Sequence, residues 1–189
     1  MAAIPAVVEL LRALRPVLAG YGRWYLFGAQ AATILGVPRL SADVDVTLKL
    51  DKDNAGDLIE ALRAAGFGTR IDDPEFVRRT RVLPLVHEST GLPLDIVLAG
   101  SGLEDEFLAR ARLVDVGGVE VPVISAEDLV IAKVLAGRPK DIEDARGVVR
   151  VQGPTLDSAR IERVLGLLEQ ALGQSDLLPT WRALGGSGR

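Results

Sequence analysis

Residues 41–46, Ser41-Ala42-Asp43-Val44-Asp45-Val46, place two aspartates one residue apart in an alternating, β-branched segment. Side chains alternate between the two faces of a strand, so Asp43 and Asp45 are expected on the same face, roughly 7 Å apart. The valines between and after them then share the other face and can be buried. Neighbouring carboxylates repel each other unless a cation lies between them, and a divalent metal is the natural candidate.

A glycine turn precedes this acidic pair. Phe27-Gly28-Ala29-Gln30 lies between a short apolar strand, residues 24–27, and a helix expected over residues 29–35. Backbone N–H groups at such a turn can bind phosphate, although a small residue there could equally serve strand–helix packing. With the acidic pair downstream we favour phosphate binding by Gly28, Ala29 and Gln30. Metal and phosphate together suggest nucleotide chemistry.

A third carboxylate, Asp95, interrupts the otherwise apolar segment 94–98. An isolated carboxylate in an apolar strand is costly unless it is paired or binds a metal. Asp95 is therefore a candidate metal ligand or catalytic base together with Asp43 and Asp45. The alternative is a set of solvated aspartates on an edge strand, or a salt bridge to Arg39 or Arg81. Arg39 is also a candidate nucleotide-binding residue.

Lys133 falls on the apolar face of a helix expected over residues 125–136. Its ammonium could extend to water from that face, or it could reach a triphosphate. Asp141 and Asp144 lie three residues apart on the next helix and could orient Lys133 or nucleotide groups. They could also simply complement the helix dipole.

Two further groups of residues have weaker functional signals. The single histidine, His87, precedes a turn near the Asp95 strand, and a lone histidine is more often structural than catalytic. Arg78, Arg79 and Arg81 form the densest basic cluster, which could contact phosphate or could be a solvated surface.

The composition narrows the function classes. The chain has 189 residues, no cysteine, one histidine and a net charge of −4. Disulfides, thiol catalysis and cysteine-ligated zinc are excluded, and a Ser-His-Asp hydrolase or multi-histidine metal site is almost excluded. No global positive field attracts the chain to nucleic acid or anionic lipid. The apolar start, residues 2–19, is interrupted by charges and prolines, so we expect a cytoplasmic protein without signal peptide or membrane span.

The periodicity predicts an α+β fold with a central mixed sheet flanked by helices and a helical C-terminal third. We expect a core of residues 1–124 and a helical region, residues 125–186, packed on it as one unit. Expected strands cover residues 24–27, 43–50, 80–87, 92–98, 114–116 and 119–121, the last four forming two hairpins. Expected helices cover residues 7–18, 29–35, 58–65, 103–111, 125–136, 141–150 and 161–172, followed by a frayed tail.

In order along the chain, these motifs resemble the nucleotidyltransferase superfamily with the polymerase-beta-like fold. Phe27-Gly28-Ala29-Gln30, Asp43-Val44-Asp45 and Asp95 match its turn, Asp-x-Asp pair and third carboxylate. Lys133 and Lys140-Asp141-Ile142-Glu143-Asp144 further resemble the AbiEii-type bacterial branch, which includes toxins of toxin–antitoxin systems. The resemblance covers roughly residues 20–150. Ala29 departs from it, because a second glycine or a serine is usual there.

The resemblance implies metal-dependent transfer of a nucleoside monophosphate from an NTP, with Mg²⁺ or Mn²⁺ as cofactor and ATP among the candidate substrates. Asp43, Asp45 and Asp95 would hold metal, while Gly28, Ala29 and Lys133 would bind phosphates. The acceptor could be tRNA, a protein hydroxyl or a small molecule such as an aminoglycoside, and a cognate antitoxin could be a partner. A catalytically silent binding module and a metal-dependent phosphohydrolase are the alternatives, the latter disfavoured by the single histidine.

Overall fold

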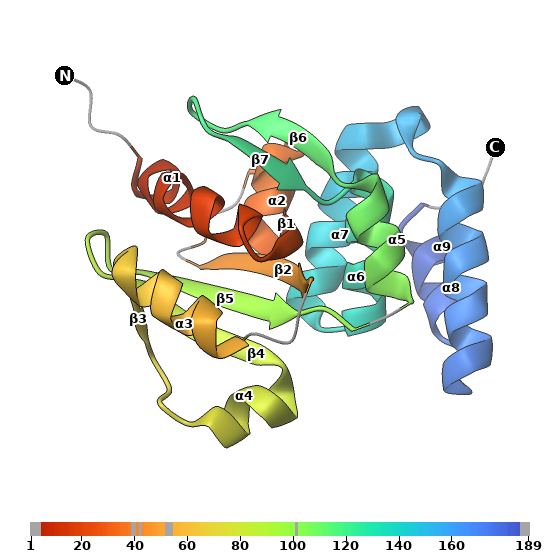
Figure 1. Cartoon of the computed structure of the whole chain (residues 1–189). Coiled ribbons are helices and arrows are strands. Elements are labelled where there is room, and N and C mark those ends of the chain that lie inside the picture. The colour runs from red at the N-terminus through yellow and green to blue at the C-terminus, as the bar shows by residue number, and fades with distance from the viewer. Residues whose placement is uncertain (1–4, 39–40, 42, 52–54, 101, 186–189) are drawn as a thin grey trace. The chain divides into compact units, whose positions relative to one another are not determined.

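The computed structural model describes residues 5–38, 41, 43–51, 55–100 and 102–185. The chain divides into two compact units. The first consists of Met1–Gln30 and Leu40–Ile124, and the second of Ala31–Arg39 and Ser125–Arg189. Every strand of the described residues belongs to the first unit, while the second is helical (Figure 1). Packing of the C-terminal region on the core stays a prediction.

The first unit is built on a mixed sheet with the order β3-β4-β5-β2-β1-β7-β6. The β1–β7 and β2–β5 pairs are parallel and the other pairs are antiparallel. The strands are β1 (Gly22–Phe27), β2 (Val44–Leu50), β3 (Phe67–Thr69), β4 (Val82–His87), β5 (Leu92–Leu98), β6 (Arg112–Asp115) and β7 (Glu120–Val123).

Helices make up most of the remaining described structure. They are α1 (Ala6–Ala19), α2 (Gly28–Ile34), α3 (Ala55–Ala64), α4 (Pro74–Thr80), α5 (Leu103–Arg110), α6 (Ala126–Ala136), α7 (Pro139–Gln152), the 3-10 turn η1 (Gly153–Thr155), α8 (Ser158–Leu172) and α9 (Leu177–Ala183). This arrangement confirms the predicted mixed α+β fold with a helix-flanked sheet. None of the helices among the described residues is long and apolar enough to span a membrane.

The two faces of the sheet differ in character. One face is apolar and buried at its centre, because the alternate residues Val44, Val46 and Leu48 of β2 and Leu94 and Ile96 of β5 have no exposed surface. This face packs against α1 and α3, which lie side by side on it (Figure 1). Burying each such side chain is worth about 1.5–3 kcal/mol. The intervening residues of β2 and β5 form the other face.

Local signals explain how α6 starts. The Ser125 side chain accepts a hydrogen bond from the backbone N–H of Asp128 at 3.2 Å and so caps the N-terminus of this helix. A buried ion pair then fixes α6 to α8, with the Arg160 guanidinium 2.8 Å from the Asp128 carboxylate.

Two predictions about the elements were wrong, and two elements were missed. β4 begins at Val82 rather than at residue 80, because α4 extends to Thr80 and Arg81 caps it in the left-handed conformation. β3 and α4 were not predicted. The tail after residue 172 is not simply frayed, because α9 buries Trp181.

Candidate functional site

Asp45 and Asp95 occupy directly paired positions on β2 and β5. Because paired residues of neighbouring strands point to the same face, their carboxylates lie side by side on the sheet face opposite α1 and α3. Adjacent strands are about 4.8 Å apart, close enough for two carboxylates to share one cation. Asp43 is exposed and lies one residue before β2. The structure therefore brings Asp45 and Asp95 together and leaves Asp43 at the edge of the pair.

Gly28 connects the glycine turn to this pair. Its φ is +69°, and a Cβ atom added there would lie 2.1 Å from Oδ2 of Asp45. The backbone at the start of α2 is thus in direct contact with the Asp45 carboxylate, and a side chain at position 28 would occupy the space that the carboxylate fills. Two motifs that the sequence separates by more than ten residues form one site.

Gln30 fixes the chain that leads into the acidic pair. Its side-chain amide donates hydrogen bonds to the backbone carbonyls of Ser41, at 3.0 Å, and Asp43, at 3.4 Å. These contacts tie α2 to the segment before β2. In this structure Gln30 positions the backbone of Asp43.

Arg70 is a further candidate residue at this site, and no sequence pattern indicated it. Its guanidinium forms an ion pair with the Asp95 carboxylate, and its backbone N–H donates to the Pro84 carbonyl. Pro84 is itself the register partner of Asp95. Arg70, Pro84, Asp95 and Asp45 therefore form one row across the sheet. Among the described residues, the ion-pair partner of Asp95 is Arg70 and not Arg81, and Arg39 lies outside the described residues.

The carboxylate pair fits a divalent metal by its chemistry. Two acidic oxygen ligands on rigid neighbouring strands suit Mg²⁺ or Mn²⁺, and Arg70 already supplies a positive charge at this point. Among the described residues, no group of three or more His, Cys, Asp or Glu side chains is spaced to hold a metal. Asp45 and Asp95 would therefore need further ligands from a bound substrate.

Helix α5 covers the sheet face that carries Asp45 and Asp95, next to these two carboxylates. The rings of Tyr25 and Phe107 meet edge to face with centroids 6.5 Å apart. Lys49, further along β2, forms an ion pair with Asp105 of α5. The hydrogen bond from Lys49 lowers the pKa of the Asp105 carboxyl below its usual value. These contacts fix α5 beside the row without using Asp45 or Asp95.

Lys133 lies in a buried cluster of charges in the second unit. Its ammonium is 2.7 Å from Asp141 and 2.8 Å from Asp144, and its side chain is only 11% exposed. The alternative prediction, that the Lys133 ammonium extends to water, is therefore wrong. Arg138 also binds Asp141, whose carboxyl is completely buried. Burial alone would raise the pKa of Asp141, but the hydrogen bonds from Arg138 and Lys133 outweigh it and lower that pKa below its usual value.

The remaining candidates have structural contacts or lie outside the described residues, as Arg39 does. Arg81 donates hydrogen bonds to the carbonyls of Leu98 and Ala99. Arg78 forms an exposed ion pair with Glu75 within α4. The buried His87 ring bonds the Thr90 hydroxyl at 2.9 Å and so supports the β4–β5 turn.

A family model described as nucleotidyltransferase of unknown function (DUF6036) matches residues 6–152. The chain belongs to this family. The match includes the glycine turn, all three aspartates, Lys133 and the Asp141/Asp144 pair. The nucleotidyltransferase resemblance is therefore confirmed at the level of the superfamily.

Solved structures share this nucleotidyltransferase fold at low sequence identity. The antibiotic-resistance factor ANT(2'')-Ia is 15% identical with a TM-score of 0.57, over 88% of this chain and 94% of that one. An antigenic nucleotidyltransferase-like protein from Paracoccidioides brasiliensis is 18% identical with a TM-score of 0.54, over 94% and 92%. JHP933 from Helicobacter pylori is 14% identical with a TM-score of 0.51, over 97% and 81%. No curated protein matches the sequence.

Proposed function

We propose that this nucleotidyltransferase transfers a nucleoside monophosphate from an NTP to an acceptor hydroxyl in a reaction that depends on Mg²⁺ or Mn²⁺. The observation that carries the proposal is the register of Asp45 and Asp95, with Gly28 packed directly against Asp45. Carboxylates side by side and a small residue at the adjacent turn are what a metal–triphosphate complex needs.

The acidic residues have the metal-binding role in this proposal. Asp45 and Asp95 would hold the metal, and substrate phosphates would complete the coordination. Asp43 would join them as a further ligand only by moving inward from the edge of the pair. Such a metal neutralises phosphate charge and stabilises the leaving pyrophosphate. The acceptor oxygen forms a bond to the α-phosphorus as the bond to the β-phosphate oxygen breaks. Asp95, or water, takes the hydroxyl proton.

The glycine turn and two cations have the phosphate-binding role. Backbone N–H groups of Gly28 and Ala29 would bind the terminal phosphates, while Gln30 keeps Asp43 in position. Arg70 would move from Asp95 to a phosphate once a metal takes its place beside the carboxylates. Arg39 is a further candidate for nucleotide binding.

The Lys133 cluster supports the finer, AbiEii-type assignment. Two buried carboxylates hold the ammonium of Lys133 in one orientation, as expected if Asp141 and Asp144 orient a phosphate-binding lysine. A nucleotidyltransferase toxin acting on tRNA or protein, restrained by a cognate antitoxin, follows from that branch.

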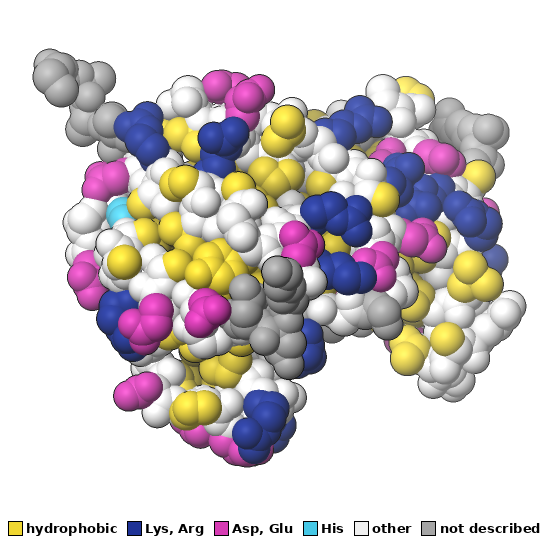
Figure 2. All heavy atoms as spheres, in the orientation of Figure 1, with side chains coloured by type: hydrophobic (Ala, Val, Ile, Leu, Met, Phe, Trp, Pro, Cys, Tyr) yellow, Lys and Arg dark blue, Asp and Glu magenta, His cyan; other side chains and the backbone are white. Residues whose placement is uncertain are grey.

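A drug-modifying activity is the second candidate. ANT(2'')-Ia, with the same fold, has been solved with adenylyl-2''-tobramycin. Acidic and basic side chains are interspersed on the face seen in Figure 2. The net charge of −4 also favours a small-molecule acceptor, since no global positive field attracts the chain to a long nucleic acid.

The fate of the phosphates tests this function. The protein is incubated with Mg²⁺ or Mn²⁺ and each NTP, labelled at the α- or γ-phosphate, in the presence of tRNA or aminoglycosides. We expect the α-label to move to an acceptor and the γ-label to leave in pyrophosphate. Inorganic phosphate release without transfer would instead show a phosphohydrolase. Absence of both labelled products, together with no Mg²⁺-dependent NTP binding, would indicate a silent binding module.

A further inference from the structure

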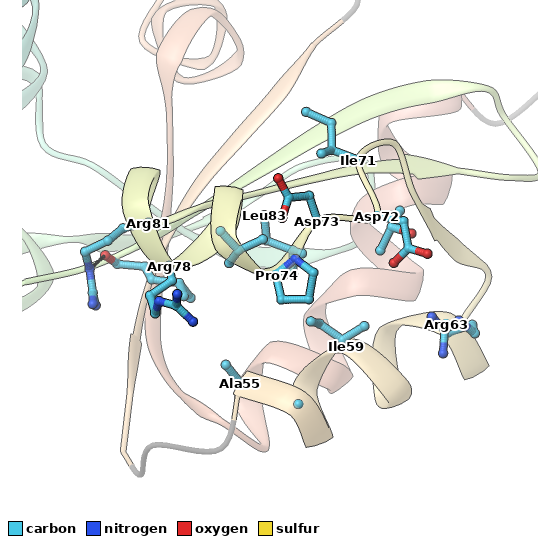
Figure 3. Close-up of a pocket in the computed structure, with 14 residues that line it drawn as sticks. Ala55, Ile59, Arg63, Ile71, Asp72, Asp73, Pro74, Arg78, Arg81 and Leu83 are labelled. Carbon is cyan, nitrogen blue, oxygen red and sulfur yellow. Dashed lines mark hydrogen bonds between the residues drawn. The ribbon is translucent and has the colours of Figure 1, made fainter.

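A pocket of about 540 Å³ lies in the first unit between α3 and α4. Its walls are Ile59 of α3 and Pro74 and Val77 of α4, and Figure 3 shows Ile59 and Pro74 facing each other across it. Leu83 and Leu98 form its floor. This volume is within the range of about 300–1,000 Å³ that is typical of small-molecule sites.

The pocket is separate from the carboxylate row. Leu83 pairs with Ile96, and Leu98 pairs with Leu48, so both floor residues belong to the buried apolar face of the sheet. Asp45 and Asp95 belong to the opposite face. The pocket is therefore not part of the site proposed for nucleotide and acceptor.

The charges at the two ends of the pocket determine which ligands fit it. Arg63 and Asp72 lie at one end and Arg78 and Arg81 at the other (Figure 3). At the first end the carboxylate offsets the guanidinium. At the second end both charged side chains are arginines, and Arg81 donates hydrogen bonds to the carbonyls of Leu98 and Ala99. Asp73 also lines the pocket, but its carboxylate caps the N-terminus of α4.

The Arg78 guanidinium at the second end of the pocket is accessible to a ligand. Arg78 forms an ion pair with Glu75 within α4, but both side chains are more than half exposed. An exposed pair of this kind contributes little stability and exchanges readily. Ile71, at the rim of the pocket, is 38% exposed and adds apolar surface.

From this lining we propose that the pocket binds a small molecule with an apolar aromatic or aliphatic body and one anionic group. The body lies on Leu83 and Leu98 between Ile59 and Val77, and the anion contacts Arg78 and Arg81. Such a ligand would join α3 to α4. The proposal is independent of the nucleotidyl-transfer reaction.

Gly56 allows the pocket to be filled without disturbing its walls. It lines the pocket within α3, and a Cβ added there would meet no atom within 4 Å. Gly56→Leu should therefore occupy the pocket and keep the fold, because leucine also favours a helix more than glycine does. Gly56→Ala is the matched control, since its methyl group leaves most of the space empty.

The test uses two fluorescent probes that differ in charge. Anilinonaphthalene sulfonate has an apolar body and one anionic group, and the neutral phenylnaphthylamine has a similar body without the anion. We expect saturable binding of the sulfonate, one per folded chain, and about tenfold weaker binding of the neutral probe. Thermal unfolding of each variant verifies that the probes meet folded protein.

Four variants then locate the binding. Gly56→Leu should abolish binding of both probes, and Gly56→Ala should retain it. Arg78→Gln should weaken only the sulfonate, by about tenfold, and Arg79→Gln, a neighbour that does not line the pocket, should change neither. Absence of saturable binding, or binding unchanged by Gly56→Leu, would overturn the pocket as a ligand site. Equal affinity for both probes would overturn the anion preference.

Discussion

At the scale of single residues, Gly28 is the most constrained position of the candidate site. Gly28→Ala requires a non-glycine residue at φ +69° and places Cβ 2.1 Å from the Asp45 carboxylate. We expect a loss of unfolding free energy of about 1–3 kcal/mol from backbone strain, and a further loss because Asp45 must move. Gly91→Ala is the matched control, since Gly91 has the same φ but open space around its Cβ. Equal losses in the two variants, measured by denaturant unfolding, would show that the Asp45 contact is unimportant.

We expect Arg70 to affect the binding of the two proposed ligands, the metal and the NTP, in opposite directions. Removing a positive charge next to Asp95 should strengthen metal binding and weaken binding of the negatively charged NTP, each by roughly fivefold. Arg70→Gln is therefore expected to bind Mn²⁺ more tightly in the absence of nucleotide and to bind NTP more weakly at saturating Mn²⁺. Arg70→Lys, which keeps the charge, should remain close to wild type in both titrations. A change of both affinities in the same direction would refute this role.

Asp141 makes stability depend on pH in the acid range. Its pKa in the folded protein is below 3.8, its usual value. Its stabilising contribution is therefore complete above that pH and is lost as the pH falls through the lower folded-state value. The difference in unfolding free energy between wild type and Asp141→Asn should shrink as the pH decreases from about 5 to about 2. A difference that stays constant across this range would contradict the lowered pKa.

Secondary-structure elements show where sequence reasoning succeeded. β2 and β5 were predicted almost to the residue, β2 from its alternating side chains and β5 from its apolar run. The helix predicted from residue 125 is also observed, with Ser125 as its N-cap. In contrast, β3 has only the three residues Phe67–Thr69, too few for alternation to be visible. α4 does have a sequence signal in Asp73-Pro74, an N-cap followed by proline.

At the same scale, α9 makes a prediction about the C-terminal region. Glycine and serine near the end suggested fraying, but Trp181 is 1% exposed. Trp181→Ala should therefore reduce the unfolding free energy by about 3–5 kcal/mol. Leu172→Ala, at a position that is 55% exposed, should change it by no more than about 0.5 kcal/mol. A small effect of both substitutions in chemical denaturation would mean that α9 does not pack as described.

At the scale of the whole molecule, the candidate site depends on the order of the strands. The sequence identified Asp45, Asp95 and Gly28 separately, because each motif has a local pattern. It could not identify Arg70, because Arg70 reaches Asp95 only once the sheet has formed. In the sheet β4 lies between β3 and β5, and Arg70, just after β3, extends across β4 to Asp95 on β5. Likewise, Lys133, Asp141 and Asp144 were recognised as candidates, but their burial as one cluster depends on how α6 packs against α7.

The central claim is that Asp45 and Asp95 together bind a metal–nucleotide complex, and calorimetric titration of NTP at saturating Mg²⁺ tests it most directly. Wild type should bind at least one NTP, and only when Mg²⁺ is present. Asp45→Asn should lose this binding by at least about tenfold while keeping its melting temperature, because metal coordination is worth several kcal/mol. Asp51→Asn, an exposed aspartate just beyond the other end of β2, should bind like wild type. Binding that is unchanged in Asp45→Asn, or absent from folded wild type with every NTP, would contradict the account.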